Sequence, residues 1–350
     1  MAVLVSCSKA EMGTEGNDMP AQELFVPSTT PIGFGTDSNW SILQSPQGEC
    51  ATKDGEPEDP FREGNVMGVF GYYRANGAAI TNLPPNFMYN QQVEHTATPW
   101  EWDYSPKKYW SNNDSDRFNF YAYYPYNELL NNYLSNQIIT LSGSSKEGLP
   151  TIHYTTPQSS FGRKVDVLYA AATDKSKTDK PVSFAFKHLL AKVQFKIAVP
   201  NPADPGVANV GTYKVLVSSI GFNIPESGVF NFAETNGNLP VWATSAQTAF
   251  FKNTVSGAGY LASKSEAEVA EDFTQYILPT TLTSLTIHLS TDLQTYSDAT
   301  VDLTANPINI EAGKITTINL NINIKGITAT AQAQPWTETE TITPEFTPDK

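Results

Sequence analysis

The chain has 350 residues, with 22 basic and 36 acidic side chains and a formal net charge of −14 at pH 7. This length predicts two domains, and the acidic excess without a Lys/Arg stripe excludes the nucleic-acid-binding classes. No run of apolar residues approaches the ~20 that a membrane-spanning helix needs. The many Thr, Asn, Ser, Tyr and Phe residues favour β-sheet, because branched and aromatic side chains fit a pleated surface.

Residues 1–22 predict a lipoprotein signal remnant followed by a tether. Leu4-Val5-Ser6-Cys7 is similar to the end of a bacterial lipoprotein signal, which is cut before a cysteine that then carries lipid. The alternative is a chance match at a cytosolic N-terminus. Residues 8–22 are polar and are expected to form a flexible tether. If Cys7 is acylated, Cys50 is left as an unpaired thiol.

Short β-strands are predicted along the first half of the chain. The expected strands are, in order, 23–26, 32–36, 40–43, 66–74, 117–126, 137–141 and 164–171. A Pro/Gly/acidic loop covers residues 44–60, and the charged stretch Asp174–Lys180 predicts a linker. We therefore expect one domain over residues 23–180 and a second over residues 181–350.

The second half repeats the β pattern. Apolar and polar residues alternate over 285–290 and 318–324, which is typical of strands with one buried face. The alternation in 182–199 changes phase near Leu189-Leu190, where we expect a β-bulge. Helix signals are weak, with two turns each expected at 127–134 and 265–273. The sequence therefore predicts an all-β protein of two tandem β-sandwiches with minor short helices.

Five motifs resemble those of the fimbrillin family, the type V pilins. They occur in the family's order and span most of the chain, roughly from residue 32 to residue 336. The motifs are Met67–Tyr73 (MGVFGYY), Arg117–Pro125 (RFNFYAYYP), Phe184–Ile197 (FAFKHLLAKVQFKI), Ala312–Lys314 (AGK) and Trp336. The lipoprotein-like start at Cys7 also fits this family.

This resemblance implies two transthyretin-like β-sandwiches and export as an outer-membrane lipoprotein with palmitate on Cys7. It further implies that a surface protease removes the first strands together with the lipid and opens an apolar groove. The C-terminal strand of another subunit would then fill that groove by β-strand addition. The expected product is a stalk, tip or anchor subunit of an adhesive, surface-exposed fimbria. Its partners would be other fimbrial subunits and host or bacterial surface ligands.

Lys53 and Arg62 are the candidate processing residues. Arg62 is the first arginine of the chain and follows the Pro/Gly/acidic loop, and Lys53 lies where many family members carry a Thr-Arg-Ala-like site. Acidic neighbours of Arg62 would hinder a protease that selects cationic residues through an acidic pocket. In the C-terminal tail, Ile342 and Phe346 are the candidate anchors of a donor strand.

No catalytic, cofactor or metal site is predicted. The four histidines are scattered, and we expect His188 to make a hydrogen bond at the bulge or the domain junction. Ser105-Pro-Lys-Lys108 matches only the spacing of a serine acyl-enzyme motif. Asn113–Asp116 could supply two carboxylates to calcium, but it lacks the glycine and distal glutamate of a calcium loop, and a solvated turn is the simpler interpretation.

The densest aromatic stretch offers a different function, that of a monomeric glycan-binding surface lipoprotein. In a strand, Trp100, Trp102 and Tyr104 would share one face, with Trp110 nearby, and such a face could stack on sugars. The alternative is that these rings form part of the core of the first domain, since aromatic side chains bury large areas.

Overall fold

The computed structural model describes most of the chain as β-strands. The described residues are 25–36, 61, 63–79, 85–96, 102–126, 139–141, 149–157, 165–199, 214–236, 239–247, 249–254, 259–262, 267–291, 298–323 and 326–336. Within them the only helical turns are the 3₁₀ turns η2 (Ala75–Gly77) and η4 (Glu271–Phe273). No helix among these residues is long and apolar enough to span a membrane. The all-β prediction is therefore confirmed.

An eight-stranded sheet organises the first half of the chain. Its strands, in spatial order, are β11 (Val182–Phe184), β2 (Phe34–Thr36), β5 (Trp102–Asp103), β4 (Met88–His95), β3 (Val66–Arg74), β7 (Arg117–Tyr124), β10 (Leu168–Lys175) and β12 (Lys187–His188). A separate ribbon pairs β1 (Pro27–Pro31) with β6 (Tyr109–Ser111). The central strands β3 and β7 are buried at nearly every position. They lack alternation because both faces of the sheet are covered.

A four-stranded sheet contributes to the aromatic cluster on one face of the eight-stranded sheet. Its order is β16 (Leu239–Thr244), β15 (Ser227–Asn236), β9 (Thr151–Thr155) and β8 (Ile139–Leu141). Phe230 and Phe232 of β15 share a core cluster with Phe70, Tyr121 and other rings of β3 and β7. This sheet therefore joins strands from before and after the expected linker.

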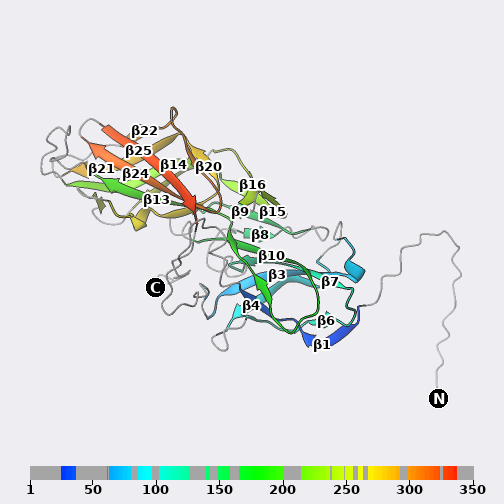
Figure 1. Ribbon diagram of the computed structural model, residues 1–350. Helices are drawn as coiled ribbons and strands as arrows, with labels where there is room; N and C mark the ends of the chain where they lie inside the picture. Colours follow the sequence, from blue (N-terminus) through cyan, green and yellow to red (C-terminus); the bar gives the residue numbers. More distant parts are fainter. Residues whose placement is uncertain are drawn as a thin grey trace, which may run out of the picture.

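The remaining strands form a sandwich around an aliphatic core (Figure 1). One sheet has the order β19 (Gln275–Ile277), β13 (Ala191–Ala198), β24 (Lys314–Asn323) and β25 (Gly326–Pro335). The other has β17 (Ala249–Thr254), β14 (Val215–Ile224), β21 (Ser284–Thr291) and β22 (Ala299–Asp302), with β18 (Tyr260–Leu261) also on β14, and β20 (Thr280–Leu282) pairs with β23 (Ile308–Ile310). The alternation predicted in β21 and β24 is confirmed, with Leu285, Ile287, Ile318 and Leu320 in this core.

Two local predictions need correction. The phase change at Leu189-Leu190 is not a bulge: β12 ends at His188 and β13 begins at Ala191, so the chain passes there from one sheet to another. Both leucines are fully buried at this crossing. The helix expected at 265–273 is reduced to the 3₁₀ turn η4, because residues 267–270 are not helical. The helix expected at 127–134 lies outside the described residues.

The domain boundaries at residues 22/23 and 180/181 stay predictions. Two observations bear on the second boundary. The short strand β11 follows Lys180 but pairs with β2 in the eight-stranded sheet, and β14 continues into β15 with only Pro225 and Glu226 between them. Both connections link the two halves closely.

Candidate functional site

The N-terminal segment, residues 25–36, is held in place by backbone hydrogen bonds to two regions, the residues on either side of β6 and the start of β11. Its Val26 carbonyl accepts from the Asn112 N–H at 2.9 Å, and its Ile32 N–H donates to the Lys108 carbonyl at 2.8 Å. The Gly33 carbonyl accepts from the Val182 N–H, also at 2.8 Å. The segment therefore bridges the β6 region and β11.

Strand β2 within this segment has a neighbour on each side. It runs parallel to β11, with Phe34 opposite Val182 and Thr36 opposite Phe184. On its other side Phe34 pairs antiparallel with Trp102 of β5. Removing β2 would therefore leave unpaired backbone edges on two strands of the same sheet, which is the condition for adding another strand.

Two side chains of the segment lie deep in the core. Ile32 is 0% exposed and Phe34 is 2% exposed. The Phe34 ring lies 5.3–5.5 Å, between ring centroids, from three other rings, and these are Tyr104, Phe120 and Phe184. The Tyr104 hydroxyl donates to the Ile32 carbonyl at 2.8 Å. We define the acceptor site as Tyr104, Phe120, Val182 and Phe184, which lie next to Phe34, together with Trp110 and Phe118 of the same core cluster.

Phe25 anchors the beginning of the segment. Its ring lies 5.0 Å from Tyr73, 5.6 Å from Phe87 and 6.5 Å from Phe118, each in an edge-on arrangement. Between these anchors β1 faces outward, and Val26 is 54% exposed. No residue of the segment is charged. It is therefore bound by apolar contacts and a few backbone hydrogen bonds, and leaving would break no ion pair.

A buried aspartate positions the residues that hold the segment. Asp116 accepts hydrogen bonds from the Tyr73 hydroxyl at 2.9 Å, from the Ser111 hydroxyl and from the Asn76 N–H at 3.0 Å. Tyr73 contacts Phe25, and Ser111 stands opposite Pro27 in the β1–β6 ribbon. Burial alone would raise the pKa of Asp116, but these hydrogen bonds outweigh it and the net pKa is lowered.

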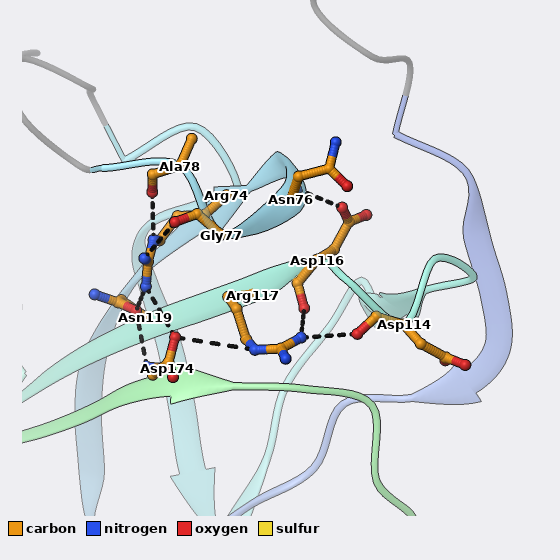
Figure 2. A network of polar contacts seen from close by, with 9 residues as sticks. All are labelled: Arg74, Asn76, Gly77, Ala78, Asp114, Asp116, Arg117, Asn119 and Asp174. Carbon is orange, nitrogen blue, oxygen red and sulfur yellow. Dashed lines mark hydrogen bonds and ion pairs between the residues drawn. The ribbon is translucent and has the colours of Figure 1, made fainter.

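Figure 2 shows the polar network around this aspartate. The guanidinium of Arg74 donates to Asn119 and to the Gly77 and Ala78 carbonyls, and it pairs with Asp174 at 3.3 Å. Arg117 donates to the carbonyls of Asp114 and Asp116. These contacts tie the ends of β3, β7 and β10 together.

The calcium hypothesis for Asn113–Asp116 finds no support in this geometry. The Asp116 carboxylate is occupied by protein donors, and the described residues contain no group of three His, Cys, Asp or Glu side chains that could hold a metal ion.

Phe61, the residue before the candidate processing residue Arg62, is part of the core. This side chain is 1% exposed and contacts Trp102, Tyr124 and Phe186, with ring centroids 5.1–5.2 Å apart. Two residues after Arg62, the Gly64 N–H donates to the His95 carbonyl at 2.9 Å. Lys53 and Arg62 themselves lie outside the described residues, as do Cys7, Ile342 and Phe346. Phe61 is thus fixed in the core just before Arg62, and the Gly64 backbone is hydrogen-bonded two residues after it.

The proposed glycan platform is corrected by burial. Trp102, Tyr104 and Trp110 are between 1% and 5% exposed and belong to the core cluster of the first half, and Trp100 lies outside the described residues. Burial also raises the pKa of the Tyr104 hydroxyl to about 12. Rings enclosed by protein offer no face to a sugar, so core packing is the interpretation that holds for these three residues.

His188 makes the expected hydrogen bond at a junction. Its Nδ1 lies 2.6 Å from Oδ2 of Asp166, and both side chains are buried. The His188 ring stacks on Trp336 with centroids 3.5 Å apart, and Trp336 stacks in turn on Tyr276 at 5.3 Å. Trp336, which directly precedes the C-terminal tail, is therefore held beside the crossing between sheets.

The sequence reasoning overlooked Ile32 and Phe34. The sequence does contain a signal for this role, because Ile32 and Phe34 alternate with glycines in an uncharged stretch that precedes Lys53 and Arg62. The sequence predicted a strand here, among the first strands that a protease would remove, but it did not indicate which side chains enter the core.

Solved bacterial surface proteins share this fold. A fimbrial protein from Bacteroides vulgatus superimposes with a TM-score of 0.55 at 20% sequence identity, over 77% of this chain and 93% of that one. A putative cell adhesion protein from Bacteroides uniformis gives a TM-score of 0.52 at 17% identity, over 89% of this chain and 100% of that one. At these identities the likeness shows the fold alone.

The sequence comparisons identify the family. The family model described as fimbrillin-like matches residues 51–336, and the chain belongs to this family. The fimbrium subunit Fim1C of Phocaeicola vulgatus is 26% identical to it over 259 residues, which make up 67% of this chain. The chain spans about 65% of the length of that curated relative. The family model and the curated relative thus agree on a fimbrillin-like chain.

Proposed function

We propose that this fimbrial subunit assembles by strand exchange at the acceptor site, supports adhesion, and reaches the outer membrane as a lipoprotein anchored through Cys7. The observation that carries the proposal is the position of the N-terminal segment. Its side chains Ile32 and Phe34 fill the core, yet the segment is uncharged and belongs to the part of the chain that precedes both candidate cleavage residues. A cut at Lys53 would make it a separable strand.

Removal of the segment would expose apolar side chains and unpaired backbone groups, which favours the binding of a replacement strand. Exposing a fully buried Ile or Phe side chain costs about 1.5–3 kcal/mol each, before counting the rings that they cover. The edges of β11 and β5 would also lose their partner. An extended strand from another subunit would pair its backbone with the open edges of β11 and β5. Its alternate side chains would enter the acceptor site and cover the exposed apolar surface.

The contacts of Phe61 favour processing at Lys53 over Arg62. A protease must hold several residues around the cut bond in an extended form, and at Arg62 this would pull Phe61 out of its contacts with Trp102 and Tyr124. A cut after Arg62 would also remove Phe61 from the mature protein. A cut after Lys53 leaves Phe61 in the core and removes residues 1–53, which include the segment.

The tail that follows Trp336 is the proposed donor. Residues 337–350 would reach roughly 45 Å when fully extended. Ile342 and Phe346 are separated by an even number of positions, so in a strand they face the same side. The segment that the donor replaces has three apolar anchors, namely Phe25, Ile32 and Phe34, whereas the tail of this chain offers two. The donor strand of a different subunit with more apolar residues would therefore bind this acceptor site more tightly than the tail of this chain does.

Limited trypsin digestion followed by mass spectrometry and native sizing tests this proposal. We expect a first cut after Lys53, release of the segment, and polymers that resist SDS until heated. Lys53→Gln should abolish both the cut and the polymers, whereas the matched variant Arg62→Gln should leave both unchanged. A chain that is cut and loses its segment but stays monomeric with donor subunits present would contradict strand exchange.

A further inference from the structure

Strand β25 forms one edge of the aliphatic sandwich. It pairs with β24 over ten residue positions, from Asn323 opposite Gly326 to Lys314 opposite Pro335. Among the described residues no strand pairs with its other side, and it lies beside β22 of the facing sheet (Figure 1). Thr330, Gln332 and Ala333 are exposed. The backbone groups on this side are therefore without a strand partner in the described part of the chain.

This edge lacks the features that usually prevent strand addition. Proteins protect edges with short strands, charged side chains or proline. The other edges of the sandwich follow this rule, since β19 has three residues, β17 carries Lys252, and β22 has four residues and ends at Asp302. In contrast, β25 has ten residues (GITATAQAQP), no charge, and a proline only at its end.

The inner face of this edge carries small side chains. In β24, Ile318 and Leu320 are fully buried, but their cross-strand neighbours in β25 are Ala331 and Ala329, which are small and only partly buried. One pair further along, Thr316 is buried opposite Ala333, and its Oγ1 has no hydrogen-bond partner. The inner face of the edge thus has two positions, Ala329 and Ala331, beside which larger apolar side chains of an added strand would pack.

We propose that the free edge of β25 accepts an extended strand of another polypeptide, which places bulky apolar side chains over Ala329 and Ala331. This interaction surface is separate from the acceptor site, and it is available whether or not the N-terminal segment has been removed. Main-chain hydrogen bonds to β25 supply the affinity, and the alternating pockets set the register.

The charge around the edge selects the partner. Asp302 ends the neighbouring strand β22, Asp298 precedes that strand and pairs with Lys252 and His288, and the chain as a whole carries a net charge of −14. A partner strand with lysine or arginine beside its apolar residues would be attracted. Pairing of β25 with a second copy of itself is disfavoured, because it would bring two strongly acidic molecules together and would place alanine against alanine over the core.

The test uses the intact, unprocessed chain and a short synthetic peptide that alternates valine with threonine and has a lysine at each end. We expect saturable binding and slower hydrogen exchange of the β25 amides, with no change at β11. Ala333→Lys places a charge on the inner face of the edge and should weaken binding about tenfold or more. Its matched control, Gln332→Lys, adds the same charge on the outer face and should change the affinity less than about threefold.

Three results would overturn the proposal. They are no binding at millimolar peptide, equal binding of a peptide whose alternate amides are methylated, and equal effects of the two lysine variants. Unfolding midpoints of both variants should match the parent chain, because both positions are exposed. Strand exchange at the acceptor site requires cleavage, so its failure would leave peptide binding to the unprocessed chain unchanged.

Discussion

Phe34→Ala should convert the N-terminal segment from a tightly held strand into a weakly held one. The ring is 2% exposed and packs against Tyr104, Phe120 and Phe184. Truncating a well-packed phenylalanine costs about 3–5 kcal/mol, which combines lost transfer free energy with the cavity left behind. Because 1.4 kcal/mol corresponds to a factor of ten, the cut segment should bind its site roughly 10²- to 10⁴-fold more weakly.

The assay measures how fast the segment leaves after a cut. A site for a specific protease is introduced near Lys53, the chain is cut, and release of residues 1–53 is followed by the fluorescence of a dye attached to the segment. We expect much faster release from Phe34→Ala than from the parent chain. The matched control is Val26→Ala, which truncates a side chain that is 54% exposed on the same segment and should change release little. Equal release rates for the two variants would refute the idea that Phe34 anchors the segment.

Three further substitutions test the surrounding structure, each by chemical denaturation. Asp116→Asn should cost about 1–3 kcal/mol near neutral pH, because an amide cannot accept all of the carboxylate's hydrogen bonds. Folding lowers the pKa of Asp116, so the stabilisation that the carboxylate contributes is present above the unfolded pKa of about 3.9 and is lost as the pH falls through the lower folded value. The difference in unfolding free energy between the parent chain and the variant should therefore disappear in acid. A difference that stays constant with pH would contradict this reasoning. His188→Ala should cost about 3–5 kcal/mol by leaving the buried Asp166 without this partner, and a cost below about 1 kcal/mol would count against the junction. Trp102→Ala should cost about 3–5 kcal/mol and leave any carbohydrate binding unchanged, whereas a stable variant that loses such binding would restore the glycan hypothesis.

The sequence was most informative where one face of a strand is buried. In β21 and β24 the apolar residues recur every second position, because only one face meets the core. Strand β3 was predicted with its observed bounds from its aromatic and branched residues alone. The phase change at Leu189-Leu190 was a genuine signal whose cause was misassigned. A local pattern records that the buried face changes, but it does not say that the chain has entered a different sheet.

Features that depend on distant residues could not be predicted. A strand was expected at 23–26, but β1 lies at Pro27–Pro31, where two prolines argue against a strand and the pairing with β6 overrides them. The pairing of β9 with β15 joins residues 151–155 to residues 227–231, and no local pattern encodes such a contact. The sequence allowed the Trp102 ring either to face a sugar on the surface or to pack in the core, and only the three-dimensional arrangement shows that it faces the core.

A cysteine trap in assembled fimbriae tests the central claim most directly. A cut after Lys53 removes both native cysteines, Cys7 and Cys50, so the processed subunit has none. Ser183→Cys places a thiol at the one exposed position of β11, opposite Gly35, and single cysteines are then scanned through residues 340–348 of the tail. Disulfides form only between Cα atoms about 4.4–6.8 Å apart. The account predicts a disulfide between subunits at a restricted set of tail positions. Polymers that form without such a cross-link at any tail position would show that this tail does not fill the acceptor site.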